Sequence, residues 1–258
     1  MHSLGMVITF VFAVTFISCG KQNVNSNDFV GLKGGIIHGK HVDESSYLFS
    51  ARLLKNYDSI CGAVYLGKKT LLTAAHCLEN LWPDETQILI QDQIYEVEDF
   101  LFHPDYEDDS SIRSENDLAI IKLYKAPMKD QLIIIAKEDL DIRELNKSSD
   151  SLFVLGTGHD ENGNKGQLKK KFLKVKEKDF LCQFNHLDQS LISGIDLALG
   201  DSGNGLFYTD GRNTFILGIN SGKTYEDEIA NQSYFKKICH RSFYSDLRKH
   251  RDWIEKNI

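Results

Sequence analysis

The stretch DLALGDSGNG, residues 196–205, places Ser202 between an acid and a glycine. A serine hydroxyl is a weak nucleophile until a base accepts its proton, and the usual base is a histidine, because the imidazole pKa lies near neutrality. The imidazole in turn needs a carboxylate that fixes its tautomer and stabilises its charged form. Ser202 therefore predicts a histidine and an acid elsewhere in the chain.

One histidine and one acid stand out as these partners. His76 follows a strand-like run in LLTAAHCL, and Asp117 begins another apolar run in SENDLAIIKL. Each residue also has a simpler interpretation. His76 could be a core histidine and Asp117 a cap at the start of a strand. Ser202 could be a turn residue, since Gly-Asp-Ser-Gly is typical of turns. Their order and surroundings taken together favour nucleophilic catalysis by His76, Asp117 and Ser202.

The motifs TAAHC, DLAIIKL and GDSG resemble those of the chymotrypsin family of serine proteases, to which trypsin belongs. The resemblance covers most of residues 36–258, which we interpret as one peptidase domain. Four further segments carry it: IIHG at 36–39, HPDY at 103–106, Gly-Thr-Gly at 156–158 and DWI at 252–254.

This resemblance implies an all-β fold of two six-stranded antiparallel barrels with a C-terminal helix, and a triad in the cleft between the barrels. It implies a trypsin-like endopeptidase that cleaves peptide bonds through an acyl-enzyme, by the mechanism established for that family. No cofactor and no metal are expected. The expected partners are protein or peptide substrates and an activating protease, with the enzyme itself a monomer.

The resemblance also assigns roles around the serine. The N–H groups of Gly200 and Ser202 would form the oxyanion hole, and a glycine suits a tight turn close to substrate. Asp201 would pair with the free amine of Ile36 after a propeptide is removed, so the chain would be a zymogen. A terminal amine has a pKa near ~8 and is charged at neutral pH.

Asp196 stands six residues before the serine. In trypsin-like relatives an aspartate at this place lies at the base of the primary specificity pocket, where it selects Arg or Lys. The plain alternative is a surface loop acid. Ser221, in a segment that resembles the family's Ser-Trp-Gly strand without its tryptophan, is expected to line the same pocket.

Three features depart from the family pattern. Asn204 replaces a second glycine, and we expect it to loosen the turn without touching a catalytic atom. The segment 197–199 replaces a stretch that normally contains a cysteine, so one pocket disulfide is missing. Gly35, and not Lys or Arg, precedes Ile36, so trimming by another protease is expected.

Five cysteines have to be placed: Cys19, Cys61, Cys77, Cys182 and Cys239. By resemblance, the pair at 61 and 77 is the disulfide of the histidine loop. The pair at 182 and 239 remains as a second bridge. None has CxxC spacing, which disfavours a zinc site.

The N-terminal region predicts export. Residues 6–17 form an apolar run of twelve residues, interrupted only by Thr9 and Thr15, which is too short for a membrane helix of about 20 residues but typical of a signal core. We interpret 1–19 as a signal peptide and 20–35 as a linker or propeptide. The box FISC resembles a bacterial lipoprotein cleavage site with Cys19 lipidated, and plain secretion remains open. Either route predicts a disulfide-permissive compartment, periplasmic, cell-envelope or extracellular.

Charge and periodicity agree with this class. The chain has 30 Lys and Arg residues and 37 Asp and Glu residues, for a net charge of −7. This charge argues against a nucleic-acid binder and gives a mild attraction for cationic substrates.

Residue patterns along the chain predict its secondary structure. The lysine-rich run 169–178 indicates the solvent-exposed face of a strand. The last fourteen residues, SDLRKHRDWIEKNI, predict a helix with Ser245 as its N-cap. Regularly spaced apolar runs predict strands at 47–54, 61–66, 70–74, 87–91, 95–102, 118–124, 151–155, 168–176, 205–208 and 214–220.

Two other function classes stay open. The first is a catalytically inactive relative that only binds protein partners, suggested by the altered pocket and the Gly35–Ile36 junction. The second is an α/β-hydrolase esterase. That class needs Gly-x-Ser-x-Gly and the order serine, acid, histidine, and Asn204 breaks the motif.

Overall fold

The computed structural model describes residues 36, 38–107, 116–128, 131, 133–141, 145, 151–159, 166–173, 190–193, 197–223 and 242–258. The predicted signal peptide, linker and lipidation site, together with Asp196, Cys182 and Cys239, lie outside these residues. Predictions about them are therefore left as predictions.

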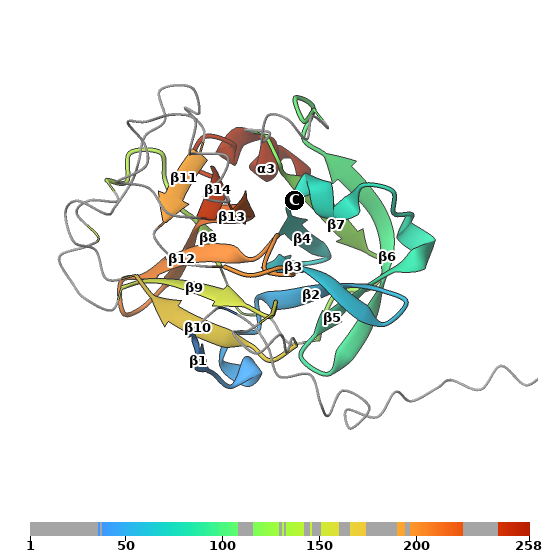
Figure 1. Cartoon of the computed structure of the whole chain (residues 1–258). Helices are drawn as coiled ribbons and strands as arrows, with labels where there is room; N and C mark the ends of the chain where they lie inside the picture. The colour runs from blue at the N-terminus through green and yellow to red at the C-terminus, as the bar shows by residue number, and fades with distance from the viewer. Residues whose placement is uncertain are drawn as a thin grey trace, which may run out of the picture. The chain divides into compact units, whose positions relative to one another are not determined.

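Six strands of the first half close into an antiparallel barrel (Figure 1). Its order is β2-β3-β4-β7-β6-β5. Short turns join β2 to β3, β3 to β4 and β5 to β6. In the β2–β3 turn Asn56 and Tyr57 have φ values of 51° and 64°, both positive as two-residue turns of the right twist require. The strands are β2 Ser50–Lys55, β3 Asp58–Gly67, β4 Thr70–Thr73, β5 Thr86–Ile90, β6 Gln93–Phe102 and β7 Ala119–Leu123.

The second half forms an eight-stranded sheet with the path β1-β10-β9-β12-β13-β14-β11, and β8 pairs with β13. The β8–β13 pair is parallel and the other pairs are antiparallel. The strands are β1 Lys40–His41, β8 Ile134–Ile135, β9 Leu152–Gly156, β10 Lys169–Phe172, β11 Ser190–Ser193, β12 Gly205–Thr209, β13 Thr214–Lys223 and β14 Ser242–Asp246. The prediction of a mostly-β fold with two barrel-like sheets is confirmed.

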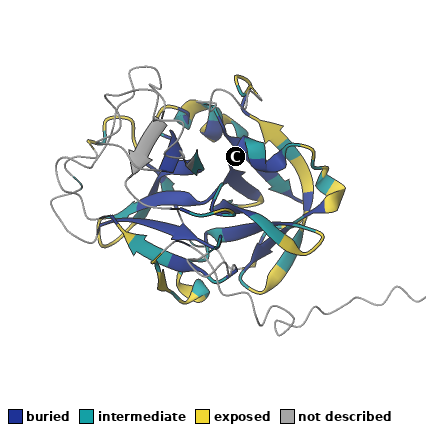
Figure 2. Cartoon of the chain, viewed as in Figure 1, coloured by how far each residue is buried: buried dark blue, intermediate teal, exposed yellow. Residues whose placement is uncertain are grey.

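One apolar core runs between the two halves. Phe49 at the entry to β2 packs on Phe207 of β12, with ring centroids 4.9 Å apart, and Phe207 stacks on Phe153 of β9 at 5.5 Å. All three rings are buried, and Figure 2 shows the buried residues concentrated along the strands. The two sheets therefore share a core, and each needs the other to bury its aromatic residues.

Two expectations about local structure were wrong. The C-terminal helix α3 spans Arg251–Asn257, while Ser245 lies in β14 and not at a helix N-cap. Pairing of β14 with β13 and β11 overrides the helical periodicity of this segment. The second error concerns Lys169, whose exposed fraction is 3% although we expected a solvated face.

No helix among the residues described above combines the length and the apolar character needed to cross a membrane.

Candidate active site

His76 and Asp117 meet at one end of two paired strands. β4 pairs with β7 so that Thr73 lies opposite Ala119, and the chain reaches His76 just after β4 and Asp117 just before β7. The imidazole Nδ1 lies 2.7 Å from Asp117 Oδ2, and the backbone N–H of His76 donates to Oδ1 at 2.9 Å. These contacts turn Nδ1 towards the acid, so that Nε2 is the ring nitrogen on the side away from the carboxylate, 3.7 Å from Cys77 Sγ.

Asp117 is also held from the second sheet. Its side chain is 4% exposed. The hydroxyl of Ser221, in β13, donates to Asp117 Oδ2 at 2.5 Å, and the hydroxyl of Ser245, in β14, donates to the Asp117 carbonyl at 3.2 Å. The hydroxyl of Ser221 thus contacts the acid, and the expected place of Ser221 in the substrate pocket stays a prediction. Sequence reasoning missed Ser245, since its segment resembles a helix.

The backbone around Ser202 is pinned to the first barrel. The Ser202 carbonyl accepts a hydrogen bond from the N–H of Gly62 at 2.7 Å, and the N–H of Gly203 donates to the Asn220 carbonyl at 2.8 Å. A Cβ on Gly203 would lie 2.1 Å from the Gly62 carbonyl oxygen and 2.4 Å from Thr73 Oγ1. With a φ of +80° as well, position 203 accepts only glycine.

A disulfide connects the strand that holds Ser202 with the turn that carries His76. Cys61 in β3, next to Gly62, is bonded to Cys77. The predicted bridge is thus present in the structure. Because Cys77 directly follows His76, the bridge ties the histidine to the backbone that hydrogen-bonds the serine. The two sulfurs lie close to His76, but they are bonded to each other and are therefore not thiolates that could bind a metal ion.

Gly200 has the conformation expected of a tight turn. Its φ is +88°, and a Cβ there would lie 3.1 Å from the Cα of Gly158. The preceding carbonyl, of Leu199, accepts from the backbone N–H of His159 at 2.8 Å and contacts His159 Nδ1 at 2.9 Å. Gly158 and His159 therefore brace the segment in which the predicted oxyanion donors lie.

Asp201 is a fully buried carboxylate. It accepts hydrogen bonds from the N–H groups of Gly158 at 2.8 Å and Ala198 at 2.9 Å. Burial raises the pKa of Asp201 to about 6, and these backbone bonds together with attraction to His159 and Lys169 act in the opposite direction. The carboxylate is therefore costly to ionise in this environment.

Ile36 lies beside this acid. Its side chain is 0% exposed. A Cβ on Gly156 would lie 2.3 Å from Asp201 Oδ1 and 2.8 Å from Ile36 Cγ1. Gly156 thus leaves room for the two side chains to meet, which agrees with the predicted proximity of the domain's first residue to Asp201.

Asn204 supports the serine turn instead of loosening it. The residue is 2% exposed. Its amide Nδ2 donates to the Asp201 carbonyl at 3.1 Å. The same amide fills the space over Gly62, where a Cβ would lie 2.3 Å from it. The expectation of a looser turn was wrong, because the longer side chain replaces the missing glycine with a packed, hydrogen-bonded group.

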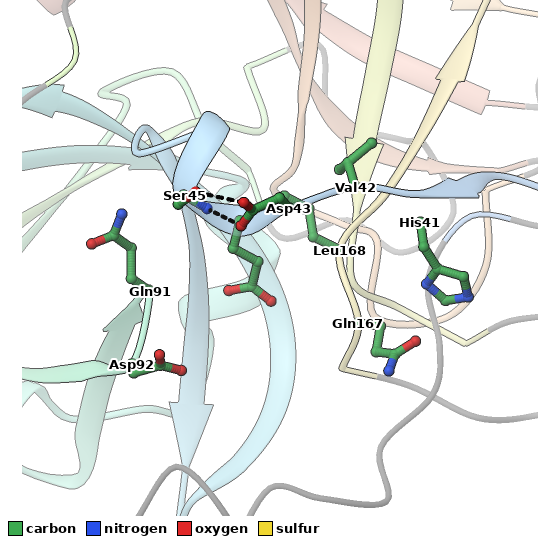
Figure 3. A pocket seen from close by; sticks show the side chains of 9 residues that line it. His41, Val42, Asp43, Ser45, Gln91, Asp92, Gln167 and Leu168 are labelled. Carbon is green, nitrogen blue, oxygen red and sulfur yellow. Dashed lines mark hydrogen bonds between the residues drawn. The ribbon is translucent and has the colours of Figure 1, made fainter.

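A separate recess of about 750 Å³ lies away from these residues (Figure 3). Asp43 there accepts from the N–H and hydroxyl of Ser45 at 2.9 and 2.7 Å, and Glu44 pairs with Arg52. Because these acids already have partners, we assign the recess no role. Its lining consists of His41, Val42, Asp43, Glu44, Ser45, Gln91, Asp92, Gln167 and Leu168.

Comparison with known proteins agrees with this geometry. A model of the Trypsin family matches residues 36–254, and the chain belongs to this family of chymotrypsin-fold serine proteases.

Individual relatives are distant. Transmembrane protease serine 11G from Mus musculus is 26% identical over 246 residues, covering 85% of this chain and 54% of that protein. Its Rattus norvegicus counterpart is 24% identical, covering 90% and 58%. Haptoglobin from Oryctolagus cuniculus is 25% identical over 56% of this chain and 41% of that protein. The chain spans little more than half the length of the first two relatives, and these animal proteins leave the predicted bacterial origin untested.

Proposed function

We propose that this protein is an exported serine endopeptidase in which Ser202 is the nucleophile, His76 the general base and Asp117 the orienting acid. The observation that carries the proposal is the contact of His76 Nδ1 with Asp117 Oδ2 at 2.7 Å. It directs the other ring nitrogen away from the acid, as a base for a serine hydroxyl requires.

The reaction follows from these roles. His76 Nε2 accepts the Ser202 proton while Oγ attacks the substrate carbonyl, and the N–H groups of Gly200 and Ser202 stabilise the oxyanion. The imidazolium then protonates the leaving amine, which leaves an acyl-enzyme. Water, activated by the same histidine, hydrolyses the ester and restores the serine.

The proposal also covers the substrate specificity of the enzyme, its activation by cleavage and its export. Asp196 at the base of the pocket would select Arg or Lys, and the free amine of Ile36 would pair with Asp201. The closeness of Ile36 to that carboxylate supports the second role. Export through residues 1–19, with a lipid anchor on Cys19 or plain secretion, would place the enzyme where the Cys61–Cys77 disulfide is stable.

The test uses protein that begins at Ile36, released from a fusion by a cleavage that leaves this residue first. A fluorophosphonate should label Ser202, and peptides with Arg or Lys before the scissile bond should be cleaved faster than peptides with apolar residues there. Ser202→Ala should abolish labelling and lower kcat by about 10⁶-fold.

Ser50→Ala, a half-buried serine of β2, is the matched control and should behave as the parent protein does. Absence of labelling and turnover in the trimmed parent protein would contradict catalysis and favour a protein that only binds partners. A preference for apolar residues would contradict the pocket role of Asp196 alone.

A further inference from the structure

Cys61, His76 and Cys77 are residues of the types that bind zinc in proteins, and they lie together. One sulfur or ring nitrogen atom of each lies within 4.8 Å of the corresponding atoms of the other two. In this structure the two sulfurs are bonded to each other and cannot act as thiolates. A dithiol reductant that opens the bridge would leave two thiols beside an imidazole.

The spacing between His76 and Cys77 already suits a tetrahedral zinc ion. His76 Nε2 lies 3.7 Å from Cys77 Sγ. A zinc ion with Zn–S of about 2.3 Å and Zn–N of about 2.0–2.1 Å places two such donor atoms about 3.5–3.6 Å apart. Cys61 Sγ lies within 4.8 Å of both atoms, and its side chain can rotate towards the ion once the bridge is open.

Asp117 gives His76 the support that a zinc-binding histidine needs. Metal-bound histidines almost always donate their other ring N–H to a carboxylate, a carbonyl or water, which fixes the tautomer and the orientation of the ring. His76 Nδ1 lies 2.7 Å from Asp117 Oδ2, and Nε2 is the nitrogen near the sulfurs. Asp117 is itself held by the backbone N–H of His76 and the hydroxyl of Ser221. The pair therefore has the arrangement of a carboxylate, a histidine and a metal site in line.

Contacts other than the bridge keep the two cysteine backbones near each other. The Thr73 hydroxyl, at the end of β4, donates to the Gly62 carbonyl of β3 at 2.8 Å, and this bond is buried. β3 and β4 are also paired neighbours in the barrel. Cys61 directly precedes Gly62, and Cys77 lies in the short helical turn Ala75–Leu78 that follows β4. The two thiols therefore stay close to the same contact between strands after the bridge opens.

We propose that opening of the Cys61–Cys77 bridge creates a Zn²⁺ site of two thiolates and His76 Nε2, and that the bound ion keeps the protein inactive. The site would exist before the bridge has formed and after a dithiol has reduced it. Inhibition rests on the proposed function, because it requires Nε2 to be the base for Ser202. Binding of the ion does not depend on catalysis.

Two steps make up this switch. The dithiol gives two electrons and two protons to the S–S bond, which breaks into two protein thiols, while the dithiol becomes a cyclic disulfide. Zn²⁺ then replaces the two thiol protons, which pass to water, and Nε2 donates its lone pair to the ion. Three protein ligands leave the fourth position to water, and two thiolates favour Zn²⁺ over Mg²⁺ or Ca²⁺.

The experiment uses the trimmed protein that begins at Ile36 and carries Cys182→Ser and Cys239→Ser, so that Cys61 and Cys77 are its only cysteines. It is reduced with dithiothreitol, freed of reductant without oxygen, and checked with a thiol reagent. Zn²⁺ and Co²⁺, whose near-ultraviolet charge-transfer band reports thiolate ligands, are titrated into the reduced and the oxidised protein.

The reduced protein should bind one ion per chain and show the thiolate band, and the oxidised protein should show neither. Reduced His76→Ala should bind at least about tenfold more weakly, and Asp117→Asn about 10–100-fold more weakly. His41→Ala, at an exposed histidine of β1, is the matched control and should bind as the parent does. Zn²⁺ should also raise the urea midpoint of the reduced protein, because it binds the folded form.

Fluorophosphonate labelling of Ser202 measures inhibition. With a chelator present, the reduced protein should label at a measurable rate. Saturating Zn²⁺ should slow this labelling at least about tenfold, because the general base is occupied, and added chelator should restore it. Labelling of the oxidised protein should not respond to Zn²⁺.

Different results would overturn the two halves of the inference. The metal site is wrong if the reduced protein binds no ion, if His76→Ala binds as tightly as the parent, or if Zn²⁺ leaves the urea midpoint unchanged or lowers it. Inhibition is wrong if Zn²⁺ does not slow labelling, or if the reduced protein fails to label without metal. If the oxidised protein itself never labels, the proposed function fails, and the titrations still decide whether the site exists.

Discussion

At the scale of single residues, Asp117 has more partners than the orientation of one imidazole requires. Its carboxylate accepts from His76 Nδ1, from the backbone N–H of His76 and from the hydroxyl of Ser221. The arrangement thus holds a nearly fully buried carboxylate in one orientation by three donors.

Burial raises the pKa of Asp201, which predicts a pH-dependent stability of the uncut chain. Its folded pKa is raised from 3.8 to about 6, so the folded state binds the proton more tightly than the unfolded state. Binding of this proton adds at most about 3 kcal/mol to the free energy of unfolding. This contribution is fully present below about pH 4 and is lost as the pH rises through about 6.

Urea unfolding of uncut protein between pH 4 and 8, compared with Asp201→Asn, checks this prediction. The difference in the free energy of unfolding between the two proteins should change across this window, because only the parent carries the Asp201 carboxyl. A difference that stays constant from pH 4 to 8 would contradict the raised pKa. In trimmed protein the change should be smaller, because the Ile36 amine favours the ionised carboxylate.

At the scale of elements, the disulfide predicts a combined loss of stability and site geometry. Cys61 and Cys77 enclose a loop with a sequence separation of 16, and closing a loop of about 15 residues is worth about 3 kcal/mol. Replacing both cysteines with serine should lower the free energy of unfolding by about this amount. It should also slow labelling of Ser202, because His76 loses a tether to the strand that holds the serine backbone.

Urea midpoints and labelling rates measure the two effects. Parent protein treated with a reductant strong enough to open the bridge should match the double variant in both. An unchanged midpoint in the double variant would show that packing of β3 and β4 alone holds the loop.

Strands were predictable from the sequence where the apolar pattern is local. Each of the ten predicted strands, such as those at 61–66 and 118–124, overlaps a strand of the structure. The short strands β1 and β8, and the later strands β11 and β14, were missed. β1 and β8 have two residues each, too few for any periodicity. The last two residues of β14 fell within the predicted helix, because the pairing partners of this strand lie elsewhere in the sequence.

The catalytic residues of the candidate site were predictable from the sequence, but the residues that support them were not. The motifs around His76, Asp117 and Ser202 indicate the chemistry, and the structure shows the first two in contact. Ser221 on the acid, Asn204 as a turn support and Lys169 in the interior could not be inferred. Each depends on strand register or on contact between distant segments, which local composition does not encode.

At the scale of the whole molecule, the shared aromatic core predicts that the two sheets unfold together. Phe207 is 1% exposed and contacts Phe49 and Phe153 from different sheets. Phe207→Ala should lower the free energy of unfolding by about 3–5 kcal/mol. Fluorescence and far-ultraviolet circular dichroism should still report one coincident transition, at a lower urea concentration.

Phe102→Ala, at a ring that is 37% exposed in β6, is the control and should cost much less. Two separate transitions in Phe207→Ala would show that the halves are independent folding units. The shared core would then be an interface between two units and not a single folding nucleus.

The hydroxyl contacts of Ser221 and Ser245 with Asp117 also set an order of events during translation. A nascent chain that has left the ribosome only as far as β7 contains His76 and Asp117 but lacks both hydroxyls. The proposed nucleophile likewise emerges late, at position 202 of 258. If the proposed function holds, the nascent chain would be unable to attack the proteins around it until Ser202, Ser221 and Ser245 have all been synthesised.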